Sequence, residues 1–105
     1  MKEYTSDIKN SVGQNKVLWS SHAEIERYQD ELTVHEVLDA ILDGEIIEEY
    51  DSDKPLPSCL LYGKANKKSI HVVLAYNSNT GFIRIITVYI PDLKRWENDL
   101  RTRRK

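Results

Sequence analysis

His71 is the residue of this sequence best placed to do acid–base chemistry. It interrupts an apolar run in the stretch SIHVVLAY, and strand alternation puts it on one face with Val73 and Ala75. An imidazole titrates near neutral pH, so it can take or give a proton. The pattern leaves two interpretations open, a catalytic histidine or a core histidine hydrogen-bonded to a neighbouring hydroxyl.

The strand that follows supplies two hydroxyl groups. Its alternation puts Thr87 and Tyr89 on one face with Ile83 and Ile85. If the connecting loop has about five residues, as in a common hairpin, His71 lies directly opposite Thr87, with Tyr89 one pleat further along. A loop one residue shorter breaks this cluster. The sequence therefore predicts an imidazole, a hydroxyl and a phenol on one sheet face, subject to the register.

A second histidine lies at the start of a helix in the stretch SSHAEIER. Ser21 and Glu24 have the spacing of a capping box, which puts His22 on the first helical position. The positive end of the helix dipole disfavours the imidazolium there, so His22 can accept a proton. Arg27 follows about 140° around the helix, so the two cannot pair on one face. The alternative for both residues is a plain surface position.

Metal and cofactor chemistry has no clear motif here. The three histidines and the single cysteine show neither H-x-x-x-H nor C-x-x-C spacing, and there is no glycine-rich phosphate loop. We therefore expect no metal ion and no cofactor. Phosphate contact is a different matter, because Arg101, Arg103 and Arg104 make the final segment RTRRK basic. The alternative is that this segment is a solvated tail.

The composition is that of a folded, water-soluble protein. The 105 residues carry a net charge of −2, with 40% hydrophobic and 30% charged residues. No apolar run has the roughly 20 residues that span a bilayer, and Cys59 lies in an apolar stretch, so we expect a cytoplasmic protein with a buried thiol. Acidic residues gather in 45–53, whereas basic residues gather at the end of the sequence. The basic end could therefore contact phosphate even though the chain as a whole is acidic.

The periodicity predicts one domain over residues 17–100, preceded by a loosely ordered lead-in (1–16) and followed by a basic tail (101–105). We expect the apolar side chains of the segment KVLW to be buried in the core. The first helix turns Ile25, Tyr28 and Leu32 inward, and the second is capped by Thr33 with Glu36 and stops at Gly44.

The second half of the chain predicts strands at 45–50, 58–63, 69–76 and 81–90. A short C-terminal helix follows, with Leu93, Trp96 and Leu100 turned inward. The fold class is therefore α+β, with two N-terminal helices packed on a four-stranded, mainly antiparallel sheet.

Three segments together resemble the DUF4258 family. They are WSSHAEIER, LDGEIIEEYDSDKPLPSCL and LLYGKANKKSIHVVLAYNSNTGFIRIITVYIP, which match the family's H-A-x-x-R-like start, its G-x-x-I/V-E-x-Y and HVV strands, and its closing TVY-x-P. The resemblance covers most of residues 17–97. Glu26 stands where the commoner form of the first motif has an arginine, and Arg27 comes one residue later.

The resemblance implies a RelE-like or barnase-like ribonuclease fold, as in metal-independent toxins that cleave mRNA. It implies RNA, including ribosome-associated mRNA, as the substrate, and a cognate antitoxin with a zinc-ribbon N-terminus as a partner. In such chemistry His71 is base or acid, Tyr89 its partner or a phosphate donor, and Thr87 an orienting hydroxyl. His22 and Arg27 would contact the phosphate.

Two other hypotheses stay open. The same fold can serve as a non-catalytic interaction domain whose partner binds the sheet face or an edge strand, and a homodimer through an exposed edge fits that hypothesis. Alternatively, His71 and the hydroxyls are purely structural and the function lies elsewhere.

Overall fold

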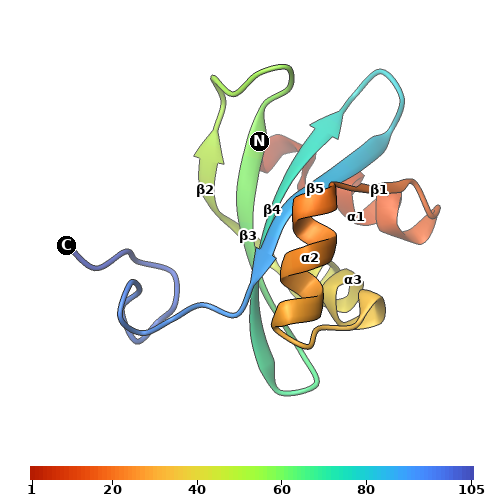
Figure 1. The fold of residues 1–105 in the computed structure, drawn as a ribbon. Helices are drawn as coiled ribbons and strands as arrows, with labels where there is room; N and C mark the ends of the chain where they lie inside the picture. Colours follow the sequence, from red (N-terminus) through yellow and green to blue (C-terminus); the bar gives the residue numbers. More distant parts are fainter.

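The computed structural model describes residues 1–105, and their α+β architecture confirms the fold class expected from the sequence (Figure 1). The elements are the 3₁₀ helix η1 (Lys2–Tyr4), α1 (Thr5–Gly13), β1 (Val17–Trp19), α2 (Ser21–Gln29), α3 (Val34–Asp43), β2 (Glu45–Tyr50), β3 (Ser58–Ala65), β4 (Lys68–Asn77) and β5 (Phe82–Tyr89). None of the helices combines the length and the apolar character needed to traverse a lipid bilayer.

The expected element count was wrong at the N-terminus. The segment 1–16 is not a loose lead-in, because it forms η1 and α1 and buries Ile8 and Ser11 of α1. The segment KVLW forms β1, whose Leu18 is about half exposed rather than part of the core. A strand of three residues is too short to show an alternating pattern, so the sequence did not reveal it.

The sheet has five strands in the order β1-β5-β4-β3-β2. Strands β2 to β5 are antiparallel neighbours, as expected, whereas β1 pairs in parallel with β5 from Val17↔Ile83 to Trp19↔Ile85. The sheet is therefore mixed. Because β1 is so short, it leaves the outer edge of β5 uncovered beyond Ile85.

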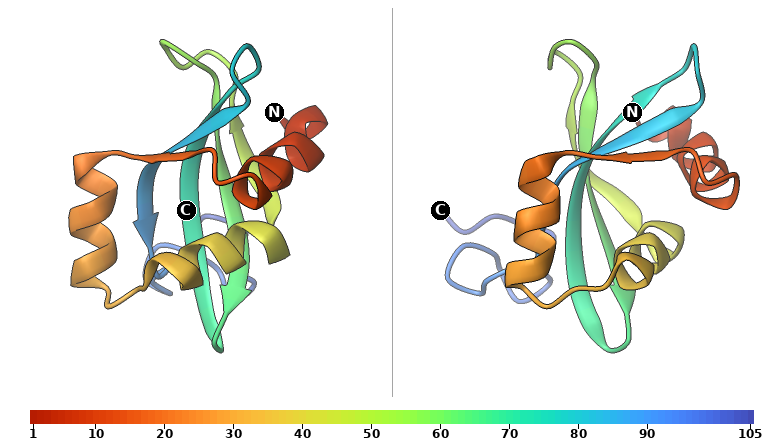
Figure 2. Two further views of the ribbon diagram at one scale, coloured as in Figure 1. Left: turned by 90° about the vertical axis from the view of Figure 1, so that its right-hand side faces the viewer. Right: turned by 45° about the vertical axis from the view of Figure 1, so that its right-hand side comes forward.

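The two faces of the sheet are covered differently. Helices α1 and α3 lie on one face, which we call the helix face, whereas α2 packs along the edge strand β5, and the C-terminal segment, residues 91–105, crosses the other face, the tail face (Figures 1 and 2). The helix face holds the hydrophobic core, in which α1 and α3 pack on the central strands through Ile8, Val37, Ala40, Ile41, Leu61, Ile70, Val72, Leu74, Ile83 and Ile85. Each of the valine, leucine and isoleucine side chains contributes roughly 1.5–3 kcal/mol on burial. Cys59 is buried here as expected, and burial raises the pKa of its thiol to about 12.

Helix α3 is specified by its own sequence. Thr33 accepts a hydrogen bond from Glu36 N while the Glu36 side chain accepts one from Thr33 N, and Gly44 ends the helix, as predicted. At Gly63 of β3, a Cβ atom would lie 1.8 Å from the Ala40 carbonyl oxygen. Only glycine permits so close an approach of α3 to the sheet.

Helix α2 corrects two expectations. The N-cap is Ser20, not Ser21, because Ser20 Oγ accepts a hydrogen bond from Ala23 N. The inward residue is the small Ala23, whereas Ile25 and Tyr28 are 57% and 79% exposed. The helix packs beside β5 and its buried face is narrow, so its apolar residues do not mark the side that faces the sheet.

Two β-bulges bring polar side chains to the tail face. Between Val73↔Thr87 and Leu74↔Ile85 the register shifts, which leaves Ile86 unpaired. Residues opposite each other in antiparallel strands share a face, so Thr87 turns to the tail face while Ile85 stays in the core. A matching shift in β2 leaves Ile47 unpaired. The expectation that Ile83 and Ile85 share a face with Thr87 and Tyr89 was therefore wrong.

The pairings generate ordered rows across the tail face. One row runs Glu45, Tyr62, His71 and Tyr89 from β2 to β5, and the next runs Glu48, Leu60, Val73 and Thr87. His71 thus lies opposite Tyr89, and Thr87 lies one pleat away opposite Val73, which reverses the expected order. The hairpin loop, closed by Asn77↔Phe82, is shorter than expected, and the bulge then shifts the remaining pairs.

The C-terminal segment is not a helix. It consists of turns, and an isolated antiparallel bridge joins Trp96 to Arg103. Trp96 is only 2% exposed, as expected of an inward residue, whereas Leu93 is 53% exposed. Asp92 accepts backbone hydrogen bonds from Arg95 and Trp96, so a single turn forms and the chain then leaves the helical path.

Candidate functional site

His71 lies at the centre of the tail face and is fully buried. Its Nε2 is 2.7 Å from the Leu100 carbonyl oxygen, which can only accept, so Nε2 carries the proton. Its Nδ1, 3.1 Å from the Tyr89 hydroxyl, therefore accepts. The Trp96 indole packs edge-on against the imidazole, with ring centroids 4.6 Å apart. Both ring nitrogens of His71 are satisfied within the protein.

This environment keeps His71 neutral. Burial is the main cause that lowers its pKa below the ordinary value, and the hydrogen bond to the Leu100 carbonyl opposes the shift only in part. The geometry matches the core histidine that the sequence left open as one interpretation. His71 is nonetheless linked to the surface through Tyr89, because the hydrogen bond at its Nδ1 fixes the orientation of the Tyr89 phenol.

Tyr89 lines a cleft of about 360 Å³ where α2, β5 and the C-terminal segment meet. Its lining combines two carboxylates, two hydroxyls and two guanidinium groups, from Glu26, Thr87, Tyr89, Ile90, Asp92, Arg95, Trp96 and Arg103. Burial raises the pKa of Tyr89, so its phenol stays protonated and donates its one proton to His71 Nδ1. The cleft therefore offers a proton acceptor, hydrogen-bond donors and cations within one concavity.

Arg103 is fixed at the wall of this cleft. Its Nε and Nη2 lie 2.8 Å and 3.0 Å from the two carboxylate oxygens of Glu48, and its guanidinium stacks 4.6 Å from the centre of the Trp96 ring. This ion pair lowers the pKa of Glu48, which also accepts a hydrogen bond from the Tyr50 hydroxyl. The bulge in β2 makes the pair possible, because it turns Glu48 to the tail face.

His22 lies at the same end of the molecule, next to Glu26. Its Nε2 is 3.3 Å from Glu26 Oε1 one helical turn later. Because the N-cap is Ser20, His22 occupies the second helical position rather than the first. The imidazole is largely exposed and contacts the cleft through Glu26.

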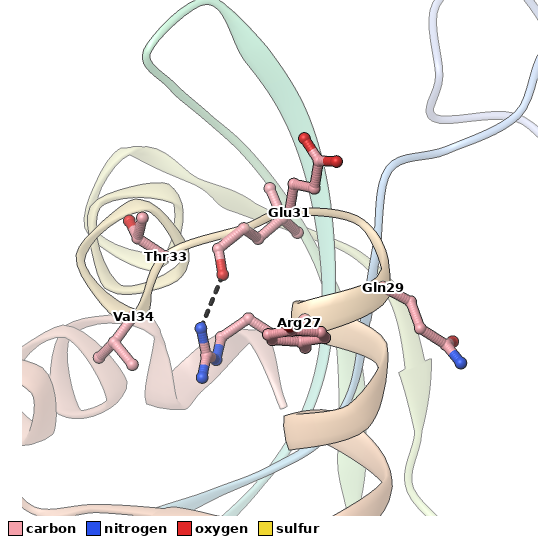
Figure 3. Close-up of a pocket in the computed structure, with 7 residues that line it drawn as sticks. Arg27, Gln29, Glu31, Thr33 and Val34 are labelled. Atoms are coloured by element: carbon pink, nitrogen blue, oxygen red, sulfur yellow. Dashed lines mark hydrogen bonds between the residues drawn. The ribbon is translucent and has the colours of Figure 1, made fainter.

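Arg27 lies outside the cleft. Its Nη1 donates to the Leu32 carbonyl oxygen at 2.8 Å, its Nε contacts Glu24 at 3.3 Å, and its guanidinium lies over the Trp19 ring. Figure 3 shows it directed at the turn between α2 and α3, where it lines a separate hollow with Thr33 and other residues. This arrangement ties the two helices together.

The basic tail is paired with acidic groups of the chain rather than freely solvated. Arg101 pairs with Glu45 and stacks 4.6 Å from the centre of the Tyr62 ring. Arg104 pairs with Glu97 within the C-terminal segment. Of the tail arginines, Arg103 alone lines the cleft.

The structure therefore brings together part of the predicted site. Tyr89, Thr87 and Arg103 line the cleft, with His71 behind Tyr89 and His22 reaching it through a partner. Arg27, Arg101 and Arg104 lie elsewhere. The chain has no group of three His, Cys, Asp or Glu side chains placed to hold a metal ion.

Sequence reasoning missed Glu26 and Arg95. For Glu26 a signal existed, since it stands four residues after His22 and so lies one turn along the same helix face. Arg95 had no such signal, because its position depends on the irregular path of the C-terminal segment.

One protein-family model matches most of this chain. The model of a domain of unknown function, DUF4258, matches residues 19–90. The chain belongs to the DUF4258 family. The match begins just before α2 and ends just after β5, so it spans most of the sheet and the Glu26 and Tyr89 sides of the cleft. Comparisons with curated proteins and with solved structures gave no match.

Proposed function

We propose that this DUF4258 protein is a toxin-type endoribonuclease that cleaves RNA without a metal ion, with the cleft between α2, β5 and the C-terminal segment as its active site. One observation carries the proposal: Glu26, Tyr89, Arg95 and Arg103 line a single cleft. Carboxylate, phenol and guanidinium are the groups that proton transfer and phosphate binding require.

The proposed reaction is attack of a ribose 2′-oxygen on the adjacent phosphorus. The transition state carries extra negative charge on the phosphate oxygens, which hydrogen-bond donors and cations stabilise. Thr87 would donate to a phosphate oxygen, and Arg95 and Arg103 would neutralise its charge. Tyr89, whose only proton goes to His71 Nδ1, would accept a hydrogen bond from a ribose hydroxyl and so orient the RNA. His71 would act through Tyr89 as a positioning residue, because its ring is sealed from solvent.

The reaction is tested with purified full-length protein and end-labelled RNA in the presence of a chelator. We expect fragments that end in 2′,3′-cyclic phosphate. Tyr89→Phe should lower the rate at least about tenfold, because it removes the hydroxyl that orients the bound ribose. Tyr28→Phe is the matched control, because Tyr28 is exposed and lies outside the cleft. Intact RNA after incubation both alone and with translating ribosomes would overturn the proposal.

We further propose that the protein acts in the cytoplasm and is held inactive by a cognate antitoxin, whose N-terminus is a zinc ribbon. Expression of the chain alone should then arrest growth, and Tyr89→Phe should relieve the arrest. Co-expression of the neighbouring gene product should also relieve it and should yield a complex on size-exclusion chromatography. Growth unaffected by the wild-type chain contradicts this part of the proposal.

A non-catalytic interaction domain is a second candidate. The exposed apolar side chains of Ile25 and Tyr28, one turn apart on the outer surface of α2, favour it because they offer an apolar contact to a partner. The same surface would also serve a homodimer. Light scattering of wild type and Tyr28→Ser tests this candidate: a dimer lost on substitution supports it, and two monomers contradict the homodimer.

A further inference from the structure

Glu26 occupies a distinctive position at the cleft. Its Oε1 accepts a hydrogen bond from Val88 N at 3.2 Å and lies 3.3 Å from His22 Nε2. Both contacts engage the same oxygen, so Oε2 is free of protein donors. The carboxylate lines the cleft with Tyr89 and Arg103. One oxygen thus fixes the group, and the other is available to a bound molecule.

Asp30 shows what a purely structural carboxylate does on this helix. One turn after Glu26, its Oδ2 accepts a hydrogen bond from Ile90 N at 2.9 Å. Together the two carboxylates accept hydrogen bonds from the backbone N–H groups of Val88 and Ile90, which β1 leaves without a strand partner. Asp30 has no histidine partner and does not line the cleft. Covering the edge of β5 therefore does not explain why Glu26 has a histidine partner or why it lines the cleft.

We propose that Glu26 is the general base of the RNA cleavage proposed above, with His22 as its positioning residue. The inference rests on that proposed function and names the group that takes the proton. Glu26 Oε2 accepts the proton of the ribose 2′-hydroxyl while the 2′-oxygen forms a bond to phosphorus. The bond from phosphorus to the 5′-oxygen then breaks. The departing oxygen takes a proton from water, and the hydroxide formed accepts the proton held by Glu26.

The other basic groups near the cleft are less suited to this role. His71 is buried under Trp96 and uses both nitrogens inside the protein. The remaining cleft carboxylate, Asp92, accepts a hydrogen bond from Lys94 N at 2.8 Å within its own turn. Glu26 differs from Asp92 because a side chain, the His22 imidazole, lies beside its fixed oxygen, and because its charge contributes to the raised pKa of Tyr89.

The decisive experiment compares Glu26→Gln with Asp30→Asn in the full-length chain. Both substitutions keep an oxygen that can accept the β5 backbone hydrogen bond, so both variants should fold and melt near the wild-type temperature. We expect Glu26→Gln to slow cleavage by about 10²–10⁴-fold, the usual contribution of a general base. Asp30→Asn should cleave within about threefold of wild type. Binding of a 2′-O-methyl RNA, which cannot be cleaved, should be retained in both variants.

The outcomes separate this inference from the proposed function. If wild type cleaves and Glu26→Gln cleaves equally well, Glu26 is not the base and the ribonuclease proposal stands. Equal losses in Glu26→Gln and Asp30→Asn would assign the effect to the edge of β5 and overturn the inference. If wild type cleaves no RNA, the proposed function has failed, and the inference with it.

The positioning role of His22 has its own test. His22→Gln keeps a side-chain donor toward Glu26, whereas His22→Leu removes it. We expect His22→Leu to lower kcat about tenfold with KM unchanged, and His22→Gln to recover part of that loss. A change in KM alone, or equal activity of the two variants, would remove His22 from the proposal.

Discussion

The two faces of strand β4 show how one strand can serve two kinds of environment. On the helix face, Ile70, Val72 and Leu74 pack against apolar side chains of the helices and other strands. On the tail face, His71 lies between Tyr62 and Tyr89 under an indole. Both faces are buried at these positions, but only the tail face is held by hydrogen bonds and ion pairs.

This difference predicts different sensitivities. Apolar packing on the helix face depends on shape and volume and is little affected by pH or salt. The tail face depends on a neutral imidazole and on the Glu48–Arg103 ion pair, so acid and salt weaken it. The predictions below test this contrast, beginning with the largest expected effect.

Removal of apolar volume from the helix face should be the most damaging change. Leu74 is fully buried in the core, so Leu74→Ala should lower the free energy of unfolding by about 3 kcal/mol, measured by urea denaturation. Val73 is its neighbour on the tail face and is partly exposed. Val73→Ala should cost about 1 kcal/mol or less. Equal losses for the two variants would show that the faces do not differ in packing.

His71 should make stability depend on pH. Burial lowers its pKa in the folded chain below the ordinary value of 6.5. Above pH 6.5 the residue is neutral in both states, and its contribution is complete. As the pH falls below 6.5, the unfolded chain gains a proton that the folded chain does not, so stability falls by up to about 1.4 kcal/mol per pH unit until the folded pKa is reached.

The measurement is urea denaturation of wild type and His71→Gln at pH 7.5 and 5.5. At pH 7.5 the variant should be about 2 kcal/mol less stable, because it disturbs two buried hydrogen bonds. The gap should narrow at pH 5.5. A gap that stays constant would mean that His71 is protonated equally easily in both states.

The sequence predicted the features that depend on neighbouring residues and missed those that depend on contacts between distant parts of the chain. The strands β2 to β5 and the cap of α3 depend on neighbouring residues, so apolar runs bounded by turn residues and the Thr33–Glu36 spacing predicted them. The pairing of His71 with Tyr89 depends instead on a bulge at Ile86. A bulge is set by contacts between strands, and no local pattern marks it.

The candidate site was predictable to a similar extent. His71, Thr87 and Tyr89 stood out because polar residues interrupt apolar strands. The cleft itself was not predictable, because one wall is the C-terminal segment, whose turns replace the expected helix. Its path depends on Trp96 packing on His71, a contact between residues far apart in the chain.

The ion pair between Glu48 and Arg103 should contribute modestly to the tail face. Arg103 is more than half exposed, so solvent screens the pair and its coupling should be about 0.5–1 kcal/mol. A double-mutant cycle with Glu48→Gln and Arg103→Gln, followed by urea denaturation, measures this coupling. In about 1 M salt the coupling should fall by at least half. A coupling energy that does not change with salt would show that it does not arise from attraction between the two charges.

The smallest change in stability is expected for a substitution on α2, because this helix packs along the edge strand β5 rather than on either face of the sheet. Its contacts with β5 are the small Ala23 and the carboxylates of Glu26 and Asp30, whereas Ile25 points to solvent. Ile25→Ser should therefore change the free energy of unfolding by no more than about 0.5 kcal/mol, measured by urea denaturation. The sequence pattern alone predicted an inward Ile25, for which the same substitution would cost several times more. A loss above about 2 kcal/mol would mean that α2 buries Ile25, and that Glu26 no longer faces the cleft.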